Sequence, residues 1–191
     1  IHNIKKIVIN LKRRPDRLES FEKEMNFIGW DYEVFDAIDK GGYVGCALSH
    51  QEIIKEFVNS DDEYIMILED DCFFMPYAKN QLEKSLGELK NTEWDFLHLG
   101  PSINCPVNNY SENLLNLFEL PKQEPHHRGI YNTVCYITNK KFAKRILDWV
   151  VESQKAIDQF FYEDIYKELK CFATSIPIVT QKNGFSDINN T

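Results

Sequence analysis

The sequence predicts one α/β domain with a mostly parallel, mixed sheet flanked by helices. Short apolar runs alternate with helical patterns along the chain, which is typical of this fold class. The run Tyr64–Leu68 has no polar alternation, as expected of a central strand covered on both faces. The 191 residues contain neither an internal repeat nor a linker, so residues 1–191 are assigned to a single domain.

In the first half of the chain, three strands are expected to alternate with two helices. Apolar side chains recur at helical spacing from Leu18 to Ile28, where Gly29 provides a C-cap, and again from Val44 to Val58. A helix between successive strands is the connection that parallel strands require. The three strands are expected at Lys6–Leu11, Tyr32–Phe35 and Tyr64–Leu68.

The second half continues the alternation around one long irregular segment. Residues 102–128 are rich in Asn, Pro and His with little periodicity, and so long a loop is uncommon unless it binds a ligand or is mobile. Pro177 confines the last expected strand to an edge or a bulge. The expected helices are Ala78–Leu89, Phe142–Val150 and about 157–169, and the expected strands are Trp94–Leu99, Tyr131–Thr138 and Cys171–Thr180.

The composition excludes several classes of protein. Acidic residues outnumber Lys and Arg by 30 to 22, giving a formal net charge of −8. A broad phosphate-binding face needs clustered cations, so we expect no nucleic-acid partner. Hydrophobic residues make up 43% of the chain, which is enough for a buried core and too many for a disordered protein. No apolar run approaches the roughly 20 residues of a membrane helix, so no membrane span is expected. Nothing in the composition indicates an oligomeric state.

The cysteine pattern is that of a domain without disulfides. None of the cysteines forms a C-x-x-C pair, so neither a zinc motif nor a disulfide framework is recognisable. We expect most of them to be buried, reduced thiols, which favours a reducing compartment. The chain begins Ile-His-Asn without an initiator Met, so we expect a domain trimmed from a longer protein. The five cysteines are Cys46, Cys72, Cys105, Cys135 and Cys171.

Three consecutive carboxylates, Glu69, Asp70 and Asp71, follow the apolar strand directly. Parallel sheets bind ligands beyond the carboxyl ends of their strands, and adjacent acids repel one another unless a positive charge lies among them. With no His or Cys beside them, these hard carboxylate oxygens suit Mg²⁺ or Mn²⁺ better than zinc. The alternative is that the acids cap the following segment or lie solvated in a turn.

Other polar residues have both a functional and a structural interpretation. The basic turn Lys12–Arg17 suits the anionic part of a nucleotide, and equally an exposed turn that leads into a helix. His50 lies just off the apolar face of its helix, where a satisfied or solvent-facing histidine is also expected. Asp158 suits the N-cap or first turn of a helix, and His126–His127 is expected to be exposed in the long loop.

A series of short motifs, in the same order along the chain, resembles glycosyltransferase family 25. This family includes bacterial lipooligosaccharide galactosyltransferases and the collagen hydroxylysine galactosyltransferases. The motifs cover nearly the whole chain, and together they are far more specific than any one of them. They are Ile9–Arg17, Asp36–Asp39, Gly45–His50, Leu68–Asp71, Trp94–Gly100, Tyr136–Thr138, Ile157–Phe160 and Phe185–Ile188.

The resemblance implies a GT-A-like fold, whose Rossmann-like sheet binds a nucleotide-sugar through the N-terminal half and an acceptor through the later half. It implies transfer of a hexose, galactose or glucose, from a UDP-sugar to a glycan or a hydroxylysine-type protein acceptor. Asp71 would be a ligand of Mn²⁺ or Mg²⁺, with Glu69 as its partner. The residues implied to surround the nucleotide-sugar are Asn10, Arg13, Arg14, Arg17, Asp36, Ala37, Ile38, Asp39, Ser49, His50 and Asp70.

The resemblance also assigns the acid–base chemistry of an inverting transfer, in which a carboxylate removes the proton of the acceptor hydroxyl. Asp158 is the best match to the family's later acidic motif. The sequence departs from the commoner Asp-Glu-Phe pattern because Gln159 stands in the middle. A third protein ligand for the metal is missing from the motifs, and the candidates near the C-terminus are Gln181, Ser186 and Asp187.

Two other functions remain open at this stage. A non-catalytic module that binds nucleotides or glycans on the same fold would show changes such as Gln159 and an incomplete metal site. A glycoside hydrolase needs two carboxylates held about 5–10 Å apart. Three adjacent acids suit a cation better than such a pair.

Overall fold

The computed structural model describes residues 4–119, 129–149 and 155–182, which form a large mixed sheet with helices on both faces. Its eight strands lie in the order β2-β1-β3-β10-β5-β11-β8-β7. Two smaller antiparallel pairs, β4 with β12 and β6 with β9, lie apart from it. The strands of the large sheet are β1 Lys5–Asn10, β2 Glu33–Asp36, β3 Tyr64–Glu69, β5 Phe96–His98, β7 Asn108–Asn109, β8 Leu114–Asn116, β10 Cys135–Asn139 and β11 Cys171–Thr174.

The sheet is mostly parallel, as the sequence predicts. β1 pairs in parallel with both β2 and β3, and β11 pairs in parallel with β5. β10 runs antiparallel between β3 and β5, which makes the sheet mixed. The prediction of a central strand is confirmed, because β3 lies between β1 and β10 and the side chains of Ile65–Leu68 are fully buried.

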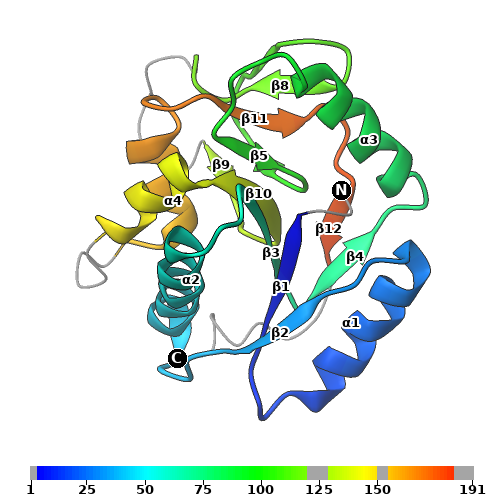
Figure 1. Ribbon diagram of the computed structural model, residues 1–191, viewed down its shortest axis with the longest axis vertical. Coiled ribbons are helices and arrows are strands. Elements are labelled where there is room, and N and C mark those ends of the chain that lie inside the picture. Colours follow the sequence, from blue (N-terminus) through cyan, green and yellow to red (C-terminus); the bar gives the residue numbers. More distant parts are fainter. Residues whose placement is uncertain (1–3, 120–128, 150–154, 183–191) are drawn as a thin grey trace.

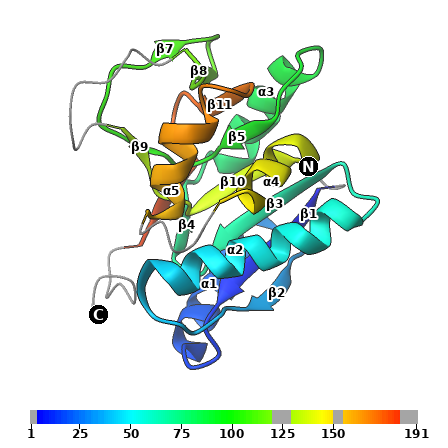
Figure 2. The ribbon, with the colours of Figure 1, turned by 90° about the vertical axis from the view of Figure 1, so that its left-hand side faces the viewer.

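The helices divide between the two faces of the sheet (Figure 1). Along β1, Ile7 and Ile9 pack with α2, whereas Val8 points to the opposite face and packs with α1. This alternation is the period of two expected of a strand covered on both sides. Figure 2 shows α2, α4 and α5 together on one side of the sheet. The helices are α1 Pro15–Ile28, α2 Gly42–Asn59, α3 Ala78–Leu89, α4 Lys140–Leu147 and α5 Ile157–Phe160.

Local sequence signals fix the helix ends. Pro15 is the first residue of α1, where its missing N–H costs nothing. Gly29 ends this helix with a φ of 70°, a left-handed conformation that glycine adopts without strain. At α4, the side chain of Asn139 accepts hydrogen bonds from the backbone amides of Lys141 and Phe142. None of the helices in the described residues is long and apolar enough to cross a membrane.

The structure differs from the sequence-based expectation in four places, three of them in the irregular segment, the strand after it and the helix after residue 156. The irregular segment after residue 101 contains the short strands β6 Ser102–Ile103, β7 and β8, which the lack of periodicity concealed. The expected strand Tyr131–Thr138 is split into β9 Ile130–Tyr131 and β10 by a turn at Asn132, whose φ is 69°. The helix after residue 156 changes at Phe161–Ile165 into a π-helix, η2.

The expected edge strand Cys171–Thr180 is also two strands. Pro177 lies between β11 and β12 Val179–Gln181, because it cannot donate a ladder hydrogen bond. β11 is an interior strand between β5 and β8, so the expected position at an edge or a bulge was wrong for this part of the segment, whereas β12 belongs to a two-stranded sheet and is an edge strand. β12 instead pairs with β4 Cys72–Phe74, which follows the acidic triplet, and this brings Gln181 opposite Cys72.

Candidate functional site

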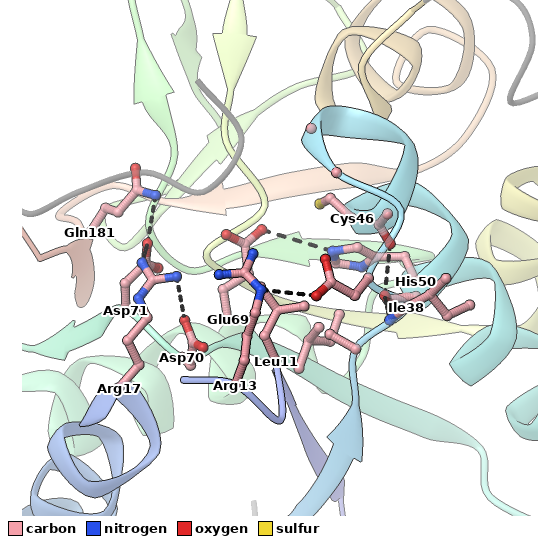
Figure 3. Close-up of a pocket in the computed structure, with 17 residues that line it drawn as sticks. Leu11, Arg13, Arg17, Ile38, Cys46, His50, Glu69, Asp70, Asp71 and Gln181 are labelled. Atoms are coloured by element: carbon pink, nitrogen blue, oxygen red, sulfur yellow. Dashed lines mark hydrogen bonds and ion pairs between the residues drawn. The ribbon is translucent and has the colours of Figure 1, made fainter. Parts of the chain in front are cut away.

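A pocket opens beyond the carboxyl ends of β1, β2 and β3 (Figure 3). These parallel strands end at one edge of the sheet, so the segments that follow them meet there. The first turns of α2 and the end of β12 complete the pocket. Of the residues that the sequence predicts for the site, it gathers Arg13, Arg17, Ala37, Ile38, Asp39, Ser49, His50, Glu69, Asp70 and Asp71.

Arg17 holds two of the three adjacent acids. Its guanidinium lies 3.0 Å from Asp70 Oδ1 and 3.0 Å from Asp71 Oδ2. Asn10 does not line the pocket. It holds one of the lining acids, because its side-chain amide donates a hydrogen bond to Asp70 Oδ2 at 2.7 Å. Burial raises the pKa of Asp70, and Arg17 and Asn10 oppose that rise. The basic turn is therefore more than an exposed charged loop, since Arg17 reaches into the acidic cluster.

Asp71 keeps one unsatisfied oxygen. Its Oδ2 accepts a hydrogen bond from Gln181 Nε2 at 2.9 Å as well as the contact with Arg17. Its Oδ1 is buried and has no hydrogen-bond partner among the described residues. Burial, together with the charge of Glu69, raises the pKa of Asp71 to about 6. An anionic oxygen in this condition can accept a cation or a proton.

Glu69 is held from the opposite side. The hydroxyl of Thr133 donates a short hydrogen bond to Glu69 Oε1, and His50 Nε2 lies 3.8 Å from the same oxygen. Burial acts to raise the pKa of Glu69, but His50, Thr133 and Arg17 together hold it below its usual value. This carboxylate is therefore kept ionised inside the pocket.

His50 and Cys46 both line the pocket wall that faces Glu69. His50 is fully buried, so the solvent-facing interpretation of this residue was wrong. The argument that no His or Cys stands beside the acids was also wrong. Cys46, His50 and Glu69 each offer a ligand atom, and these atoms lie within 4.8 Å of one another. The spacing of four residues in a helix, which places Cys46 and His50 on one face, was the available signal.

The loop between β2 and α2 lies against the first turns of α2, on the same side of the pocket as Cys46 and His50 (Figure 3). Arg13 pairs with Asp39 at 2.9 Å, and this exposed pair joins the loop to the segment after β1. The buried hydroxyl of Ser49 accepts a hydrogen bond from the backbone amide of Ile38 at 2.9 Å and donates to Gly45 at 2.7 Å. Ser49 therefore shapes the loop.

Three residues predicted for the site point elsewhere. Arg14 forms an exposed ion pair with Asp16, and Asp36 forms one with Lys12. Neither Arg14 nor Asp36 lines the pocket. Asp158 also lies outside the lining, where its two carboxylate oxygens accept hydrogen bonds from the backbone amides of Asn132 and Gln159.

The N-cap of α5 is Ala156, and Asp158 lies in the first turn of this helix, which confirms one of the two structural interpretations of this residue. It remains in the electrostatic neighbourhood of the pocket, since its charge contributes to raising the pKa of the Cys46 thiol. The candidates Ser186 and Asp187, the pair His126–His127 that was expected to be exposed, and the motif at Phe185–Ile188 lie outside the described residues.

The donor set suits a hard divalent cation at Asp71. Mg²⁺ and Mn²⁺ are commonly bound through one or two carboxylates, with phosphate oxygens and water completing the coordination. The unpartnered Asp71 Oδ1 is a buried oxygen of this kind at the edge of the pocket. Gln181, a candidate third ligand, lies against Asp71, and its side-chain amide donates a hydrogen bond to Asp71 Oδ2.

Curated relatives match about half of this chain. A glycosyltransferase 25 family member from Aedes aegypti is 28% identical over an alignment of 123 residues that covers 49% of this chain and 20% of that protein. A putative glycosyltransferase from Acanthamoeba polyphaga mimivirus is 32% identical over an alignment of 129 residues that covers 54% of this chain and 39% of that protein. A procollagen galactosyltransferase 1-B from Xenopus laevis is 28% identical over 124 residues, covering 49% and 20%. The chain thus matches well under half the length of these relatives.

Solved structures share the fold. A glycosyltransferase involved in glycosylation of the major capsid of PBCV-1 has a TM-score of 0.53 at 11% identity, covering 90% of this chain and 92% of that one. S. aureus TarS in complex with UDP-GlcNAc has a TM-score of 0.55 at 11% identity, covering 99% and 52%. At this identity the likeness concerns the fold, which is the GT-A-like architecture.

The family model described as glycosyltransferase family 25 (LPS biosynthesis protein) matches residues 40–161. The match begins in the loop that forms one wall of the pocket and runs through the acidic triplet to α5. Because it spans more than half of the sequence, the chain belongs to glycosyltransferase family 25.

Proposed function

We propose that this domain transfers a hexose from a UDP-sugar to a hydroxyl acceptor with the help of a divalent cation. The observation that carries the proposal is the unpartnered, buried Asp71 Oδ1 in a pocket that also contains two arginines. An anionic donor cannot approach three carboxylates unless positive charge offsets them. Membership of family 25 and a relative named procollagen galactosyltransferase support a galactosyl or glucosyl donor.

The chain's own cations would face the diphosphate. Arg13 and Arg17 line the same pocket from the segment after β1, and a guanidinium provides the donor geometry that phosphate oxygens require. The loop from Ala37 to Asp39 is joined to Arg13 by the ion pair with Asp39 and would contact the ribose or base. Ser49 would act indirectly, by keeping the Ile38 amide and therefore the loop in place.

Asp71 and Glu69 are the residues that would hold Mn²⁺ or Mg²⁺. A bound cation of this type neutralises the charge that develops on a diphosphate leaving group. Asp71 offers its unpartnered oxygen, and Glu69 is kept ionised by His50 and Thr133. Arg17 would move part of its contact from the acids to the donor phosphates.

Asp158 would receive the proton of the acceptor. As the acceptor oxygen bonds to the anomeric carbon, the bond from that carbon to the diphosphate breaks and UDP leaves with the electron pair. Attack on the face opposite the leaving group inverts the anomeric centre. The acceptor would be a sugar hydroxyl or a hydroxylysine-type side chain, in keeping with the name of the Xenopus relative.

A panel of UDP- and GDP-sugars with Mn²⁺, scored for nucleotide release, tests the proposal. We expect release of UDP from UDP-galactose or UDP-glucose, and loss of release in Asp71→Ala with the circular dichroism spectrum unchanged. Asp148→Ala is the matched control, since Asp148 is an exposed acid paired with Arg145. Normal turnover by Asp71→Ala would show that Asp71 is not the metal ligand.

A second candidate is a non-catalytic nucleotide-binding module on the same fold. Two observations favour it: Arg17 already contacts both Asp70 and Asp71, and both oxygens of Asp158 accept backbone hydrogen bonds. Such a module binds UDP in the presence of Mn²⁺ but releases no nucleotide from any donor. Slow hydrolysis of a UDP-sugar without acceptor would exclude it.

A further inference from the structure

The wall of the pocket opposite Asp71 contains a second group of potential metal ligands. Cys46 and His50 project from one face of α2 toward Glu69 at the end of β3 (Figure 3). In the described parts of the chain, one group of three His, Cys, Asp or Glu residues has ligand atoms that all lie within 4.8 Å of one another. This group is Cys46, His50 and Glu69. Asp71 is not a member of this group.

The spacing is close to that of a tetrahedral zinc site. Bond lengths of about 2.3 Å to sulfur and 2.0 Å to nitrogen or oxygen place neighbouring ligand atoms roughly 3.3–3.5 Å apart. The separation of His50 Nε2 and Glu69 Oε1 is 3.8 Å, so small side-chain rotations would close the group around one ion.

The second observation is the state of His50. Its side chain is fully buried, and its Nε2 has no hydrogen-bond partner among the residues described. A distance of 3.8 Å to Glu69 is too long for a hydrogen bond. A buried imidazole nitrogen without a partner is unsatisfied, and a cation between it and Glu69, whose Oε1 already accepts a hydrogen bond from Thr133, would supply that partner.

The other nitrogen of His50 is already fixed. His50 Nδ1 lies 2.8 Å from the hydroxyl of Tyr136 on β10, and the two rings stack with centroids 5.7 Å apart. Metal-binding histidines commonly donate their second ring N–H to such a partner, which orients the ring and leaves the first nitrogen as a ligand. Thr133 holds Glu69 in the same way from the other side.

We propose that Cys46, His50 and Glu69 bind one thiophilic divalent cation, with Zn²⁺ as the best fit, at a position that includes Glu69 of the proposed Mn²⁺ site but not Asp71. A thiolate, an imidazole and a carboxylate are the ligands that zinc prefers, whereas Mg²⁺ and Mn²⁺ avoid sulfur. On binding, Cys46 loses its thiol proton to solvent and the sulfur bonds to the metal. The three ligands leave a fourth position open toward the pocket.

This site does not depend on sugar transfer, since it needs only the three side chains and the metal. It does share Glu69 with the proposed Mn²⁺ site. Occupation by Zn²⁺ would therefore engage one carboxylate that the donor-bound cation would otherwise use. We expect Zn²⁺ to weaken Mn²⁺-supported UDP binding in the wild-type chain and to do so less in Cys46→Ser.

Cobalt spectroscopy of the metal-free full chain is the direct test. We expect Co²⁺ to bind at one ion per chain with the near-ultraviolet charge-transfer band of a cobalt–thiolate bond, and Zn²⁺ to displace it. Cys46→Ser should lose the band, and Tyr136→Phe should keep it with an affinity about 10–100-fold lower. The matched control is Cys105→Ser, which changes the other half-buried cysteine and should leave the band intact.

A second measurement on the unaltered chain covers the case in which Cys46→Ser fails to fold. Zn²⁺ should slow alkylation of Cys46, but not of Cys105, as read by mass spectrometry of the peptides. Absence of a thiolate band, or equal alkylation of Cys46 with and without Zn²⁺, overturns the proposal. Neither readout uses a nucleotide-sugar, so this result stands apart from success or failure of the transferase assay.

Discussion

The guanidinium of Arg17 lies 3.0 Å from Asp71 Oδ2, so a residue in the first helix holds an acid that follows the third strand. The same guanidinium contacts Asp70 at 3.0 Å. Arg17 is 19% exposed, and Asp70 and Asp71 are more buried than that. The positive charge of Arg17 offsets the repulsion among the three adjacent carboxylates in this pocket.

Arg17→Ala should destabilise the fold strongly at neutral pH. Removing one partner of a buried ion pair leaves uncompensated charge and costs about 3–5 kcal/mol. The loss should shrink as the pH falls toward 5, because Asp71, with a pKa raised to about 6, becomes protonated. Urea unfolding at pH 7.5 and pH 5 measures both effects.

Lys23→Ala on the same helix is the control for Arg17→Ala. Lys23 forms an exposed ion pair with Glu19 at 3.0 Å, and such a pair contributes about 0.3–0.5 kcal/mol. If the two variants had similar free energies of unfolding, Arg17 would not stabilise the acidic cluster.

Asp71→Asn should change how stability depends on pH. The folded-state pKa of Asp71 is about 6, above its unfolded value near 3.8, so the folded chain binds the proton more tightly. This group therefore lowers the free energy of unfolding as the pH rises from about 4 to about 6. A shift of that size corresponds to at most about 3 kcal/mol.

The neutral amide of Asp71→Asn should remove this loss, making the variant more stable than wild type at pH 7.5 and less distinct from it at pH 4. Urea denaturation across that range gives the difference curve. A variant less stable than wild type at pH 7.5 would show that Arg17 stabilises the ionised form more than burial penalises it. Added Mn²⁺ should stabilise the wild type and not the variant.

The elements of the fold were predictable where buried side chains follow a regular pattern in the sequence. The unbroken apolar run of β3 and the helical spacing from Leu18 to Ile28 gave the main elements at the correct positions. The order of the strands was not predictable, because nothing local places β10 between β3 and β5. The short strands after residue 101 were missed because two or three residues are too few to show a period.

Part of the site was predictable from residues that are neighbours in sequence, and part, including Arg17 and His50, from the resemblance to family 25. Glu69, Asp70 and Asp71 were found because they follow a strand directly. The contacts of Thr133 with Glu69 and of Tyr136 with His50 depend on the antiparallel register that pairs Cys135 with Leu68. A register between strands 67 residues apart is a property of the packed sheet, so sequence patterns could not supply these two contacts.

Gly45→Ala should disturb the wall of the pocket formed by the loop before α2. A Cβ atom at Gly45 would lie 2.5 Å from the backbone oxygen of Ile38 and 3.2 Å from the amide nitrogen of Lys40. Because these are backbone atoms, the loop must shift, and overpacking of this kind costs about 1–3 kcal/mol. We expect weaker UDP binding by calorimetry together with a lower free energy of unfolding.

Gly87→Ala provides the opposite outcome on α3. A Cβ atom there has nothing within 4 Å, and alanine in a helix is favoured over glycine by about 0.5–1 kcal/mol. This variant should be more stable than wild type with unchanged UDP binding. If Gly45→Ala and Gly87→Ala had the same UDP affinity and the same free energy of unfolding, the loop would adjust to the extra methyl group without consequence for the pocket.

Asp158→Asn tests the acid–base step. Replacing a positioned general base reduces the rate by about 10²–10⁴-fold, so we expect transfer to fall at least about 100-fold while UDP binding in the presence of Mn²⁺ is retained. The amide keeps one acceptor oxygen for the two backbone N–H groups of Asn132 and Gln159. One half-buried amide therefore loses its partner, at a cost of up to about 1–3 kcal/mol, so transfer should be measured well below the unfolding temperature of the variant.

Asp164→Asn is the matched control, because Asp164 lies on the next turn and forms an ion pair with Lys155 in which its side chain is 38% exposed. It should transfer at the wild-type rate. If Asp158→Asn retained full transfer while folded, the proton of the acceptor would have to go to another group, and the ionised Glu69 inside the pocket would be the nearest alternative on chemical grounds. A loss of UDP binding in Asp158→Asn would instead indicate that the Asn132 turn, through Thr133 and Glu69, couples the acceptor side to the donor pocket.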